Sequence, residues 1–169
     1  MCILYRNIRP NDSKEVKAES LENEIVSPMD GQLIDISEVP DQVFASKMIG
    51  DGMAIIPTNN EVYAPCDGVV DSIFATNHAL ILTCDNGAEI LIHVGLNTVQ
   101  LDGKYFDVKV KKEDKVKKGQ VLLTFEKEKI EEAGYKLVTP IVVCNADDLK
   151  FTKSGSGETK VGKILMAIE

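Results

Sequence analysis

The chain has 169 residues, a length that allows one domain with a substantial core and leaves no room for a second domain of ordinary size. Hydrophobic residues make up 44% of the chain and charged residues 27%, which is typical of a globular protein. Lys and Arg number 19 against 27 Asp and Glu, a formal net charge of −8 at pH 7. This acidic balance argues against a nucleic-acid-binding protein and is compatible with basic protein partners.

The chain lacks long apolar runs, and its N-terminal part is largely polar. No apolar run is long enough to cross a bilayer, and the first residues lack the longer apolar stretch of a signal peptide, so we expect a cytoplasmic protein that is not inserted in a membrane. Residues 11–24 are polar and offer almost nothing to bury. We therefore interpret residues 1–24 as a flexible leader or a linker remnant, and residues 25–169 as the folded domain.

Short apolar runs that alternate with turn residues predict many short strands. Residues 106–111 alternate with a period of two, and residues 121–125 and 164–168 have the length and composition of buried strands. One or two helical turns are expected over 41–49, and a short helix over 126–133. Many short strands with frequent Gly and Pro turns indicate an all-β sandwich or barrel with few helical turns.

Two short patterns occur twice in the chain. Ser-Pro-Met-Asp-Gly at 27–31 returns as Ala-Pro-Cys-Asp-Gly at 64–68, and Lys-Lys-Gly-Gln-Val-Leu at 117–122 resembles Lys-Val-Gly-Lys-Ile-Leu at 160–165. Each pattern is a turn that leads into a strand. Two copies of each predict two similar halves around one core, against the alternative that such short patterns recur by chance.

The four cysteines lie far apart, at positions 2, 66, 84 and 144, and no Cys-x-x-Cys pair indicates a zinc or redox site. In a reducing compartment we expect free thiols, with the last three packed as small hydrophobic side chains.

The two histidines, His78 and His93, stand on either side of an Asn-Gly pair at 86–87. Asn-Gly is a strong hairpin signal, because both residues tolerate a positive φ. A two-residue turn pairs Asp85 with Ala88 and places the histidines diagonally on one sheet face, about 7–8 Å apart. A three-residue loop would place them on opposite faces, so this prediction depends on the register.

Three chemistries are open to a pair of converging histidines. They could bind a metal, although two ligands are too few and no third stands nearby in the sequence. They could act as an acid–base pair. One imidazole could instead be a nucleophile that accepts a phosphoryl group while the other donates a hydrogen bond to its oxygens. The structural alternative is a pair of partly buried histidines with no chemical role.

Several separated motifs resemble enzyme IIA of the bacterial sugar phosphotransferase system, glucose class. The segment Ile-Leu-Ile-His-Val-Gly-Leu-Asn-Thr-Val at 90–99 is similar to that family's active-site segment. Matching stretches occur in the same order at 39–44, 50–55, 76–79 and 139–142. The likeness extends from residue 26 to the C-terminus, and it implies a β-sandwich of duplicated hybrid motifs.

The resemblance implies a phosphotransferase. His93 would accept phosphate from phospho-HPr through Nε2 and pass it to a cysteine of the IIB domain of a sugar permease. His78 would steady the phosphoryl oxygens, and the Thr76 hydroxyl, on the same strand face, would fix an imidazole tautomer. We expect a protonated His78 to lower the pKa of His93. No cofactor is required, although His78 and His93 could hold an adventitious zinc ion or one that a partner protein completes.

The resemblance also implies a docking surface around His93. An exposed apolar ring with acidic spots suits transient docking of a basic carrier protein, although each apolar residue alone could equally be core. Asn97 stands where the family usually has Asp, which removes one ionic contact. The positions that match the family's surface are Asp41, Val43, Phe44, Met48, Ile49, Phe74, Leu91, Gly95, Asn97 and Asp147.

Three other functions are less well supported by the residues present. A biotinyl or lipoyl carrier needs a lysine on an exposed hairpin tip, and the candidate tip at 85–87 has none. A zinc peptidase needs a third metal ligand and a general base close to the histidines. A regulatory protein that binds target proteins without transferring phosphate is opposed by the intact His93, His78 and Thr76.

Overall fold

The computed structural model describes residues 22–169, so residues 1–21 of the predicted leader lie outside the described residues. The strands are β2 (Glu24–Val26), β3 (Gly31–Asp35), β4 (Asp51–Pro57), β5 (Glu61–Tyr63), β6 (Gly68–Ile73), β7 (Ala79–Cys84), β8 (Glu89–His93), β9 (Phe106–Val108), β10 (Lys115–Val116), β11 (Val121–Phe125), β12 (Thr139–Val143), β13 (Phe151–Lys153), β14 (Gly157–Thr159) and β15 (Ile164–Ile168). The helices are α2 (Gln42–Ala45) and α3 (Lys127–Glu132), with 3-10 turns η1 (Ile36–Glu38), η2 (Thr98–Leu101) and η3 (Ala146–Asp148).

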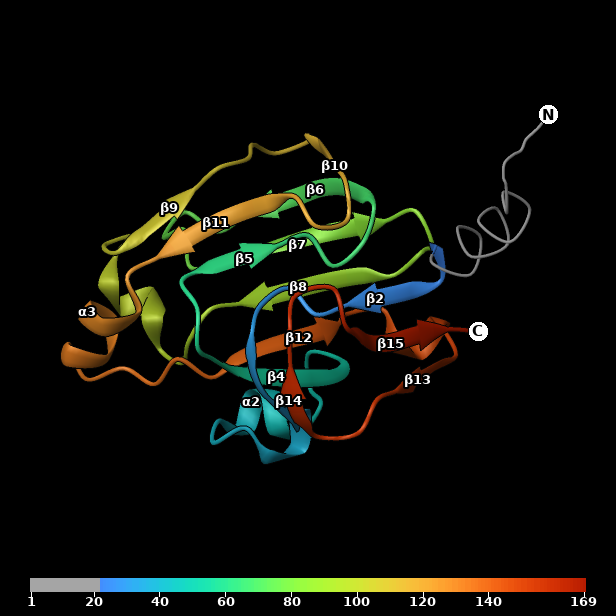
Figure 1. Ribbon diagram of the computed structural model, residues 1–169, viewed down its shortest axis with the longest axis horizontal. Helices are drawn as coiled ribbons and strands as arrows, with labels where there is room; N and C mark the ends of the chain where they lie inside the picture. Colours follow the sequence, from blue (N-terminus) through green and yellow to red (C-terminus); the bar gives the residue numbers. More distant parts are fainter. Residues whose placement is uncertain (1–21) are drawn as a thin grey trace, which may run out of the picture.

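The strands pair in antiparallel fashion and form the expected all-β architecture (Figure 1). An eight-stranded sheet has the order β10-β6-β7-β8-β12-β4-β3-β14, and two three-stranded sheets have the orders β5-β11-β9 and β13-β15-β2. The strands predicted over 121–125 and 164–168 are confirmed as β11 and β15, and the two helices lie inside their predicted ranges. The strand predicted over 106–111 is shorter, since β9 ends at Val108.

The predicted duplication is confirmed by hydrogen bonds that occur in both halves. The Asp30 carboxylate accepts the backbone N–H of Val161 at 2.8 Å, and the Asp67 carboxylate accepts that of Lys118 at 2.7 Å. Each Asp-Gly turn is thereby tied to the turn that precedes a distant strand. The sheet order is also mirrored, because β14-β3-β4-β12 from one edge corresponds to β10-β6-β7-β8 from the other. An acidic turn residue that caps a second turn explains why both short patterns recur together.

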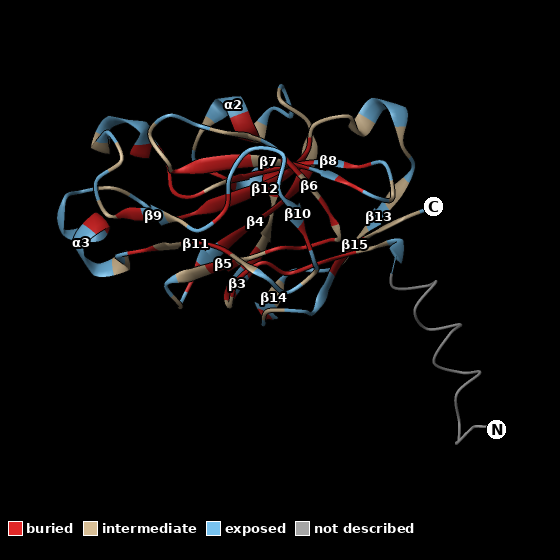
Figure 2. Ribbon diagram, turned by 90° about the horizontal axis from the view of Figure 1, so that it is seen from above, coloured by how far each residue is buried: buried red, intermediate tan, exposed pale blue. Residues whose placement is uncertain are grey.

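Buried residues run along the central strands (Figure 2). The larger core cluster includes Ile90 and Ile92 of β8, whereas Leu91, between them, belongs to a second cluster. Alternate residues of a strand point to opposite faces, so β8 is packed on both sides. The second cluster, which also contains Phe44 of α2, lies on the face of β8 that leads to His93. None of the helices in the described part of the chain is long and apolar enough to span a membrane.

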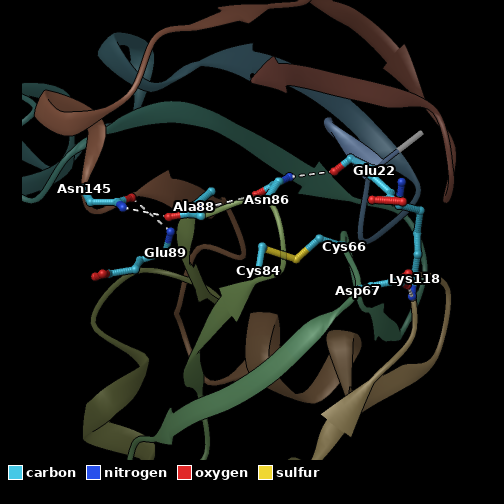
Figure 3. The surroundings of a disulfide bond; sticks show 10 residues. Glu22, Cys66, Asp67, Cys84, Asn86, Ala88, Glu89, Lys118 and Asn145 are labelled. Atoms are coloured by element: carbon cyan, nitrogen blue, oxygen red, sulfur yellow. Dashed lines mark hydrogen bonds between the residues drawn. A yellow bond between two sulfur atoms is a disulfide. The ribbon is translucent and has the colours of Figure 1, made fainter. Parts of the chain in front are cut away.

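Cys66 and Cys84 form a disulfide, so the prediction of free thiols was wrong for this pair (Figure 3). The two cysteines are 18 residues apart in sequence. The pairing of β6 with β7 brings them together, because Gly68, two residues after Cys66, is the register partner of Cys84. Sequence spacing does not show this pairing. Cys144 is a half-buried free thiol, and Cys2 lies outside the described residues.

Candidate active site

The β7–β8 hairpin carries the histidines, and its register differs from the prediction. Cys84 donates its N–H to the carbonyl of Ala88 at 2.8 Å, and Gly87 donates to the carbonyl of Cys84 at 2.9 Å. The loop therefore has three residues, and Ala79 pairs with His93. The predicted two-residue turn was wrong because Gly87, at φ 96°, takes the left-handed position that closes a three-residue loop.

The two imidazoles meet despite this register. His93 is the last residue of β8, whereas His78 precedes β7 and follows Asn77, whose φ of 61° is left-handed. Because His78 lies outside the strand, the alternation of the sheet does not determine where its ring points. The ring centroids of His78 and His93 are 4.6 Å apart with an interplanar angle of 84°. The predicted convergence of the histidines is confirmed, and the turn before β7, rather than a diagonal pairing, produces it.

Each imidazole is oriented by a hydrogen bond at Nδ1. His93 Nδ1 lies 2.8 Å from the carbonyl oxygen of Gly95. A carbonyl only accepts, so His93 Nδ1 carries the proton and Nε2 keeps its lone pair. His78 Nδ1 lies 2.8 Å from the hydroxyl of Thr76. Thr76 was expected on a strand but lies in the turn between β6 and β7. Its hydroxyl nevertheless reaches the imidazole of His78.

Gly95 is required by the space around it. Its φ is 83°, a backbone conformation that residues with a Cβ atom rarely adopt. A Cβ at this position would lie 2.6 Å from the Thr98 methyl carbon and 3.0 Å from the carbonyl oxygen of Lys136. Thr98 is buried and donates its hydroxyl to the carbonyl of Val94 at 2.6 Å. The carbonyl that orients His93 is therefore set in a tightly packed turn.

Aromatic rings surround the histidine pair. Phe44 lies 5.1 Å from His93, and Phe74 lies 5.5 Å from His78 and 6.5 Å from His93, measured between ring centroids. Phe106 approaches His78 at 6.4 Å. Phe106 was predicted only as the start of a strand and was not among the predicted site residues. These rings exclude water from part of the imidazole pair, which strengthens electrostatic interactions there.

Burial lowers the pKa of both histidines. His78 is 1% exposed, and burial together with the charge that His93 would carry lowers its pKa to about 4. The pKa of His93 is also lowered, chiefly by burial, against the opposing effects of the Gly95 carbonyl and Asp41. Both rings are therefore neutral at pH 7, and the expectation of a protonated His78 was wrong for the unphosphorylated protein.

We expect the folded protein to lose stability as the pH falls from about 6.5 to about 4. In that window the unfolded chain, with an ordinary histidine pKa near 6.5, binds a proton that folded His78 refuses. The corresponding loss in the free energy of unfolding is on the order of 3 kcal/mol for this one group. Urea unfolding at a series of pH values measures the loss, and His78→Gln is the matched control that should remove most of it. A midpoint near 6.5 for the His78 ring in an NMR titration would contradict the prediction.

The predicted docking residues divide into a surface group and a buried group. Val43, Met48 and Phe74 are exposed apolar side chains, and the polar residues Asn97 and Asp147 are exposed as well. Asp41 and Ile49 are half-buried. In contrast Phe44, Leu91 and Gly95 are buried, so they support the site from beneath and are not contact residues. Val99, which is 51% exposed and follows His93 by six residues in the sequence, is a further apolar surface residue that was not among the predicted docking residues.

The described residues contain no group of three or more His, Cys, Asp or Glu that could hold a metal ion. His78 and His93 together supply two imidazoles. An ion on this pair would therefore need ligands from outside the described part of the chain.

A β-sandwich of two related halves, with two neutral imidazoles meeting in an apolar surround, is the class of fold and site that the enzyme IIA resemblance implies. The chain belongs to the family described as phosphoenolpyruvate-dependent sugar phosphotransferase system, EIIA 1, whose model matches residues 23–149. The sequence resemblance to enzyme IIA is thus confirmed.

Relatives of this family occur both alone and fused to other components. The chain is 40% identical over 168 residues to the PTS system glucose-specific EIIA component of Oceanobacillus iheyensis, which covers 96% of this chain and 99% of the relative. It is 45% identical over 146 residues to the PTS system beta-glucoside-specific EIIBCA component of Dickeya chrysanthemi, covering 82% of this chain but only 23% of that longer protein. Among solved structures, glucose permease IIA from Mycoplasma capricolum matches with a TM-score of 0.80 and 35% identity, covering 86% of this chain and 94% of the other.

Proposed function

We propose that Nε2 of His93 accepts a phosphoryl group from phospho-HPr and passes it to a cysteine of a IIB domain, in the cytoplasm and as a step of sugar uptake. The observation that carries this proposal is the 2.8 Å hydrogen bond between His93 Nδ1 and the Gly95 carbonyl. It places the proton on Nδ1 and leaves the lone pair of Nε2 available as a nucleophile.

The proposed step exchanges one nitrogen–phosphorus bond for another. The lone pair of His93 Nε2 forms a bond to phosphorus while the bond to the donor imidazole breaks, and the donor nitrogen keeps the electron pair. When the Thr76 hydroxyl donates to His78 Nδ1, the proton of neutral His78 is on Nε2. From there it can donate to an equatorial phosphoryl oxygen, which stabilises charge in the transition state. The transfer needs no cofactor.

Two features support protein partners for this site. Val43, Met48 and Phe74 of the predicted docking surface are exposed, Asp147 is exposed and Asp41 is half-buried, a composition that suits a partner with an apolar patch and basic side chains. Relatives in which EIIA is fused with EIIB support a IIB partner. The exposed Asn97 contributes no charge to this surface. Binding of zinc by the histidine pair is a further proposal, and it requires a partner to supply the missing ligands. Binding of regulatory target proteins is another.

The test is incubation of the protein with enzyme I, HPr and labelled phosphoenolpyruvate, followed by addition of a IIB domain. We expect an acid-labile, base-stable label that maps to His93 and that leaves the protein when IIB is added. Absence of label while HPr itself is fully phosphorylated would overturn the proposal.

A further inference from the structure

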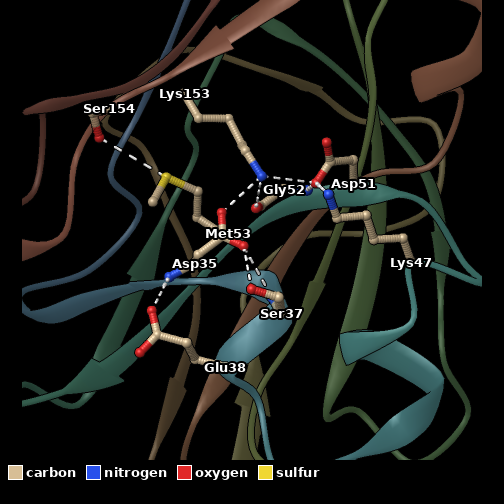
Figure 4. A network of polar contacts seen from close by, with 9 residues as sticks. All are labelled: Asp35, Ser37, Glu38, Lys47, Asp51, Gly52, Met53, Lys153 and Ser154. Atoms are coloured by element: carbon tan, nitrogen blue, oxygen red, sulfur yellow. Dashed lines mark hydrogen bonds and ion pairs between the residues drawn. The ribbon is translucent and has the colours of Figure 1, made fainter.

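A network of polar contacts lies outside the histidine site, at the amino group of Lys153 (Figure 4). Lys153, the last residue of β13, donates to Asp35 at 2.7 Å, to Asp51 at 2.9 Å and to the carbonyl of Gly52 at 3.3 Å. An ammonium group has three protons, and these three acceptors use all of them. The Lys153 side chain is 22% exposed, so the ion pairs are partly shielded from solvent.

The two carboxylates bound by Lys153 stand at the two ends of one segment. Asp35 is the last residue of β3 and Asp51 the first residue of β4, so residues 36–50 form the excursion between these paired strands. We call residues 36–50 the docking excursion. It carries Asp41, Val43, Phe44, Met48 and Ile49 of the predicted docking surface.

The clamp continues into the start of the docking excursion. One carboxylate oxygen of Asp35 binds Lys153, and the other accepts the backbone N–H of Ser37 at 3.1 Å and its hydroxyl at 2.7 Å. Asp35 is thus the N-cap of η1. Burial would raise the pKa of Asp35, but hydrogen bonds from Lys153 and Ser37 lower it to about 2, so the carboxylate remains ionised at pH 7.

At the other end, Asp51 connects the clamp to the return of the excursion. Its Oδ1 accepts Lys153 and also the backbone N–H of Gly52 at 2.8 Å, and Lys47 approaches the same oxygen at 3.7 Å. Buried Ile36, Val39 and Phe44 anchor the middle of the excursion in the second core cluster. The apolar contacts therefore fix the interior of the excursion, whereas Lys153 closes its base.

We propose that Lys153 is a positioning residue for phosphoryl transfer, because it holds the two ends of the docking excursion together and so sets the surface on which the partner protein lands. The inference rests on the proposed function, since it assigns Lys153 a role in docking of phospho-HPr. Lys153 acts through the excursion: Phe44, within it, contacts His93 at 5.1 Å between ring centroids.

The test compares Lys153→Met, which removes the charge and keeps an unbranched stem, with Lys153→Arg, which keeps the charge. Lys160→Met is the matched control, because Lys160 is 68% exposed and only approaches Glu158 at 3.9 Å. Steady-state transfer from phospho-HPr separates KM from kcat. Amide hydrogen exchange over residues 36–50 measures local opening of the excursion in the unphosphorylated protein.

For Lys153→Met we expect KM for phospho-HPr to rise about tenfold with kcat within about twofold, and exchange over 36–50 to accelerate about tenfold. Lys153→Arg should restore both, and Lys160→Met should change neither. If Lys153→Met does not fold, Asp35→Asn tests the same clamp, because the amide can still cap η1 but lacks the charge that holds Lys153.

An unchanged KM together with unchanged exchange in folded Lys153→Met overturns the inference. Faster exchange with an unchanged KM also overturns it, because the clamp would then be structural only. Failure of the wild-type protein to accept phosphate would instead refute the proposed function. In that case Lys153→Met and wild-type exchange profiles would still show whether Lys153 closes the excursion.

Discussion

His93→Gln is expected to lower phosphoryl acceptance from phospho-HPr by at least about 10⁴-fold, because the substitution removes the nucleophile itself. The glutamine amide nitrogen reaches about as far as Nε2 of His93, although the hydrogen bond that His93 Nδ1 makes with the Gly95 carbonyl at 2.8 Å is lost. This amide nitrogen, however, has no available lone pair to attack phosphorus. Rapid-quench transfer from labelled phospho-HPr measures the loss.

The His93→Gln experiment needs evidence that docking is intact. His93 is at the end of β8 and is only half-buried, so the substitution should leave the melting temperature close to that of the wild type. Binding of unphosphorylated HPr, measured by calorimetry, should also be retained, since Val43, Met48 and Phe74 are untouched. Acceptance of label at the wild-type rate by His93→Gln would place the acceptor on another residue.

The repeated patterns allowed much of the fold to be predicted from sequence. The Asp-Gly turns at 30–31 and 67–68 are local signals, and their carboxylates bind backbone groups of Val161 and Lys118 in equivalent ways. Strands such as β11 and β15 are short apolar runs between turns, so local composition is sufficient to bound them. Because each turn leads into a strand and each is tied to a distant turn, the two repeated patterns also indicate that the two halves pack around one core.

The features that were missed depend on register or on contacts far apart in sequence. The Asn-Gly pair is compatible with loops of two or three residues, and the observed choice changes the pairing of every residue in β7 and β8. The Cys66–Cys84 disulfide was concealed by a second register, that of β6 with β7, which the sequence does not show. Lys153 binds Asp35, a residue 118 positions earlier, and no local pattern marks either residue.

The candidate site could be predicted only in part, because residue type indicates chemistry for polar residues but does not separate core from surface for apolar ones. His78, His93 and Thr76 could be named because their types and spacing suggest chemistry. Leu91 and Phe44 could not be separated from surface residues, since an apolar side chain beside an active site is equally suited to core and to docking. The structure places both in the second core cluster, whereas Val43 and Met48 are exposed.

His78→Ala is expected to leave acceptance of phosphate by His93 within about tenfold of the wild type but to slow transfer to IIB by about 10²–10³-fold. In the first step the attacking nucleophile is a neutral imidazole. In the second step it is a cysteine thiolate, whose negative charge is repelled by the phosphoryl oxygens. A donor that neutralises those oxygens is therefore worth more in the second step. His78 is placed to be that donor, because its ring lies 4.6 Å from the ring of His93.

The charge of His78 adds to this asymmetry between the two steps. Its pKa is about 4 in the unphosphorylated protein, where burial and His93 disfavour the cation. A phosphoryl dianion on the neighbouring ring favours the cation instead, so phosphorylation should raise the pKa of His78 and strengthen its hydrogen bond. Separate single-turnover measurements of the two steps test the division. His78→Gln, which restores a neutral donor, should recover part of the second rate, whereas equal losses in both steps for His78→Ala would show that His78 stabilises the two transfers alike.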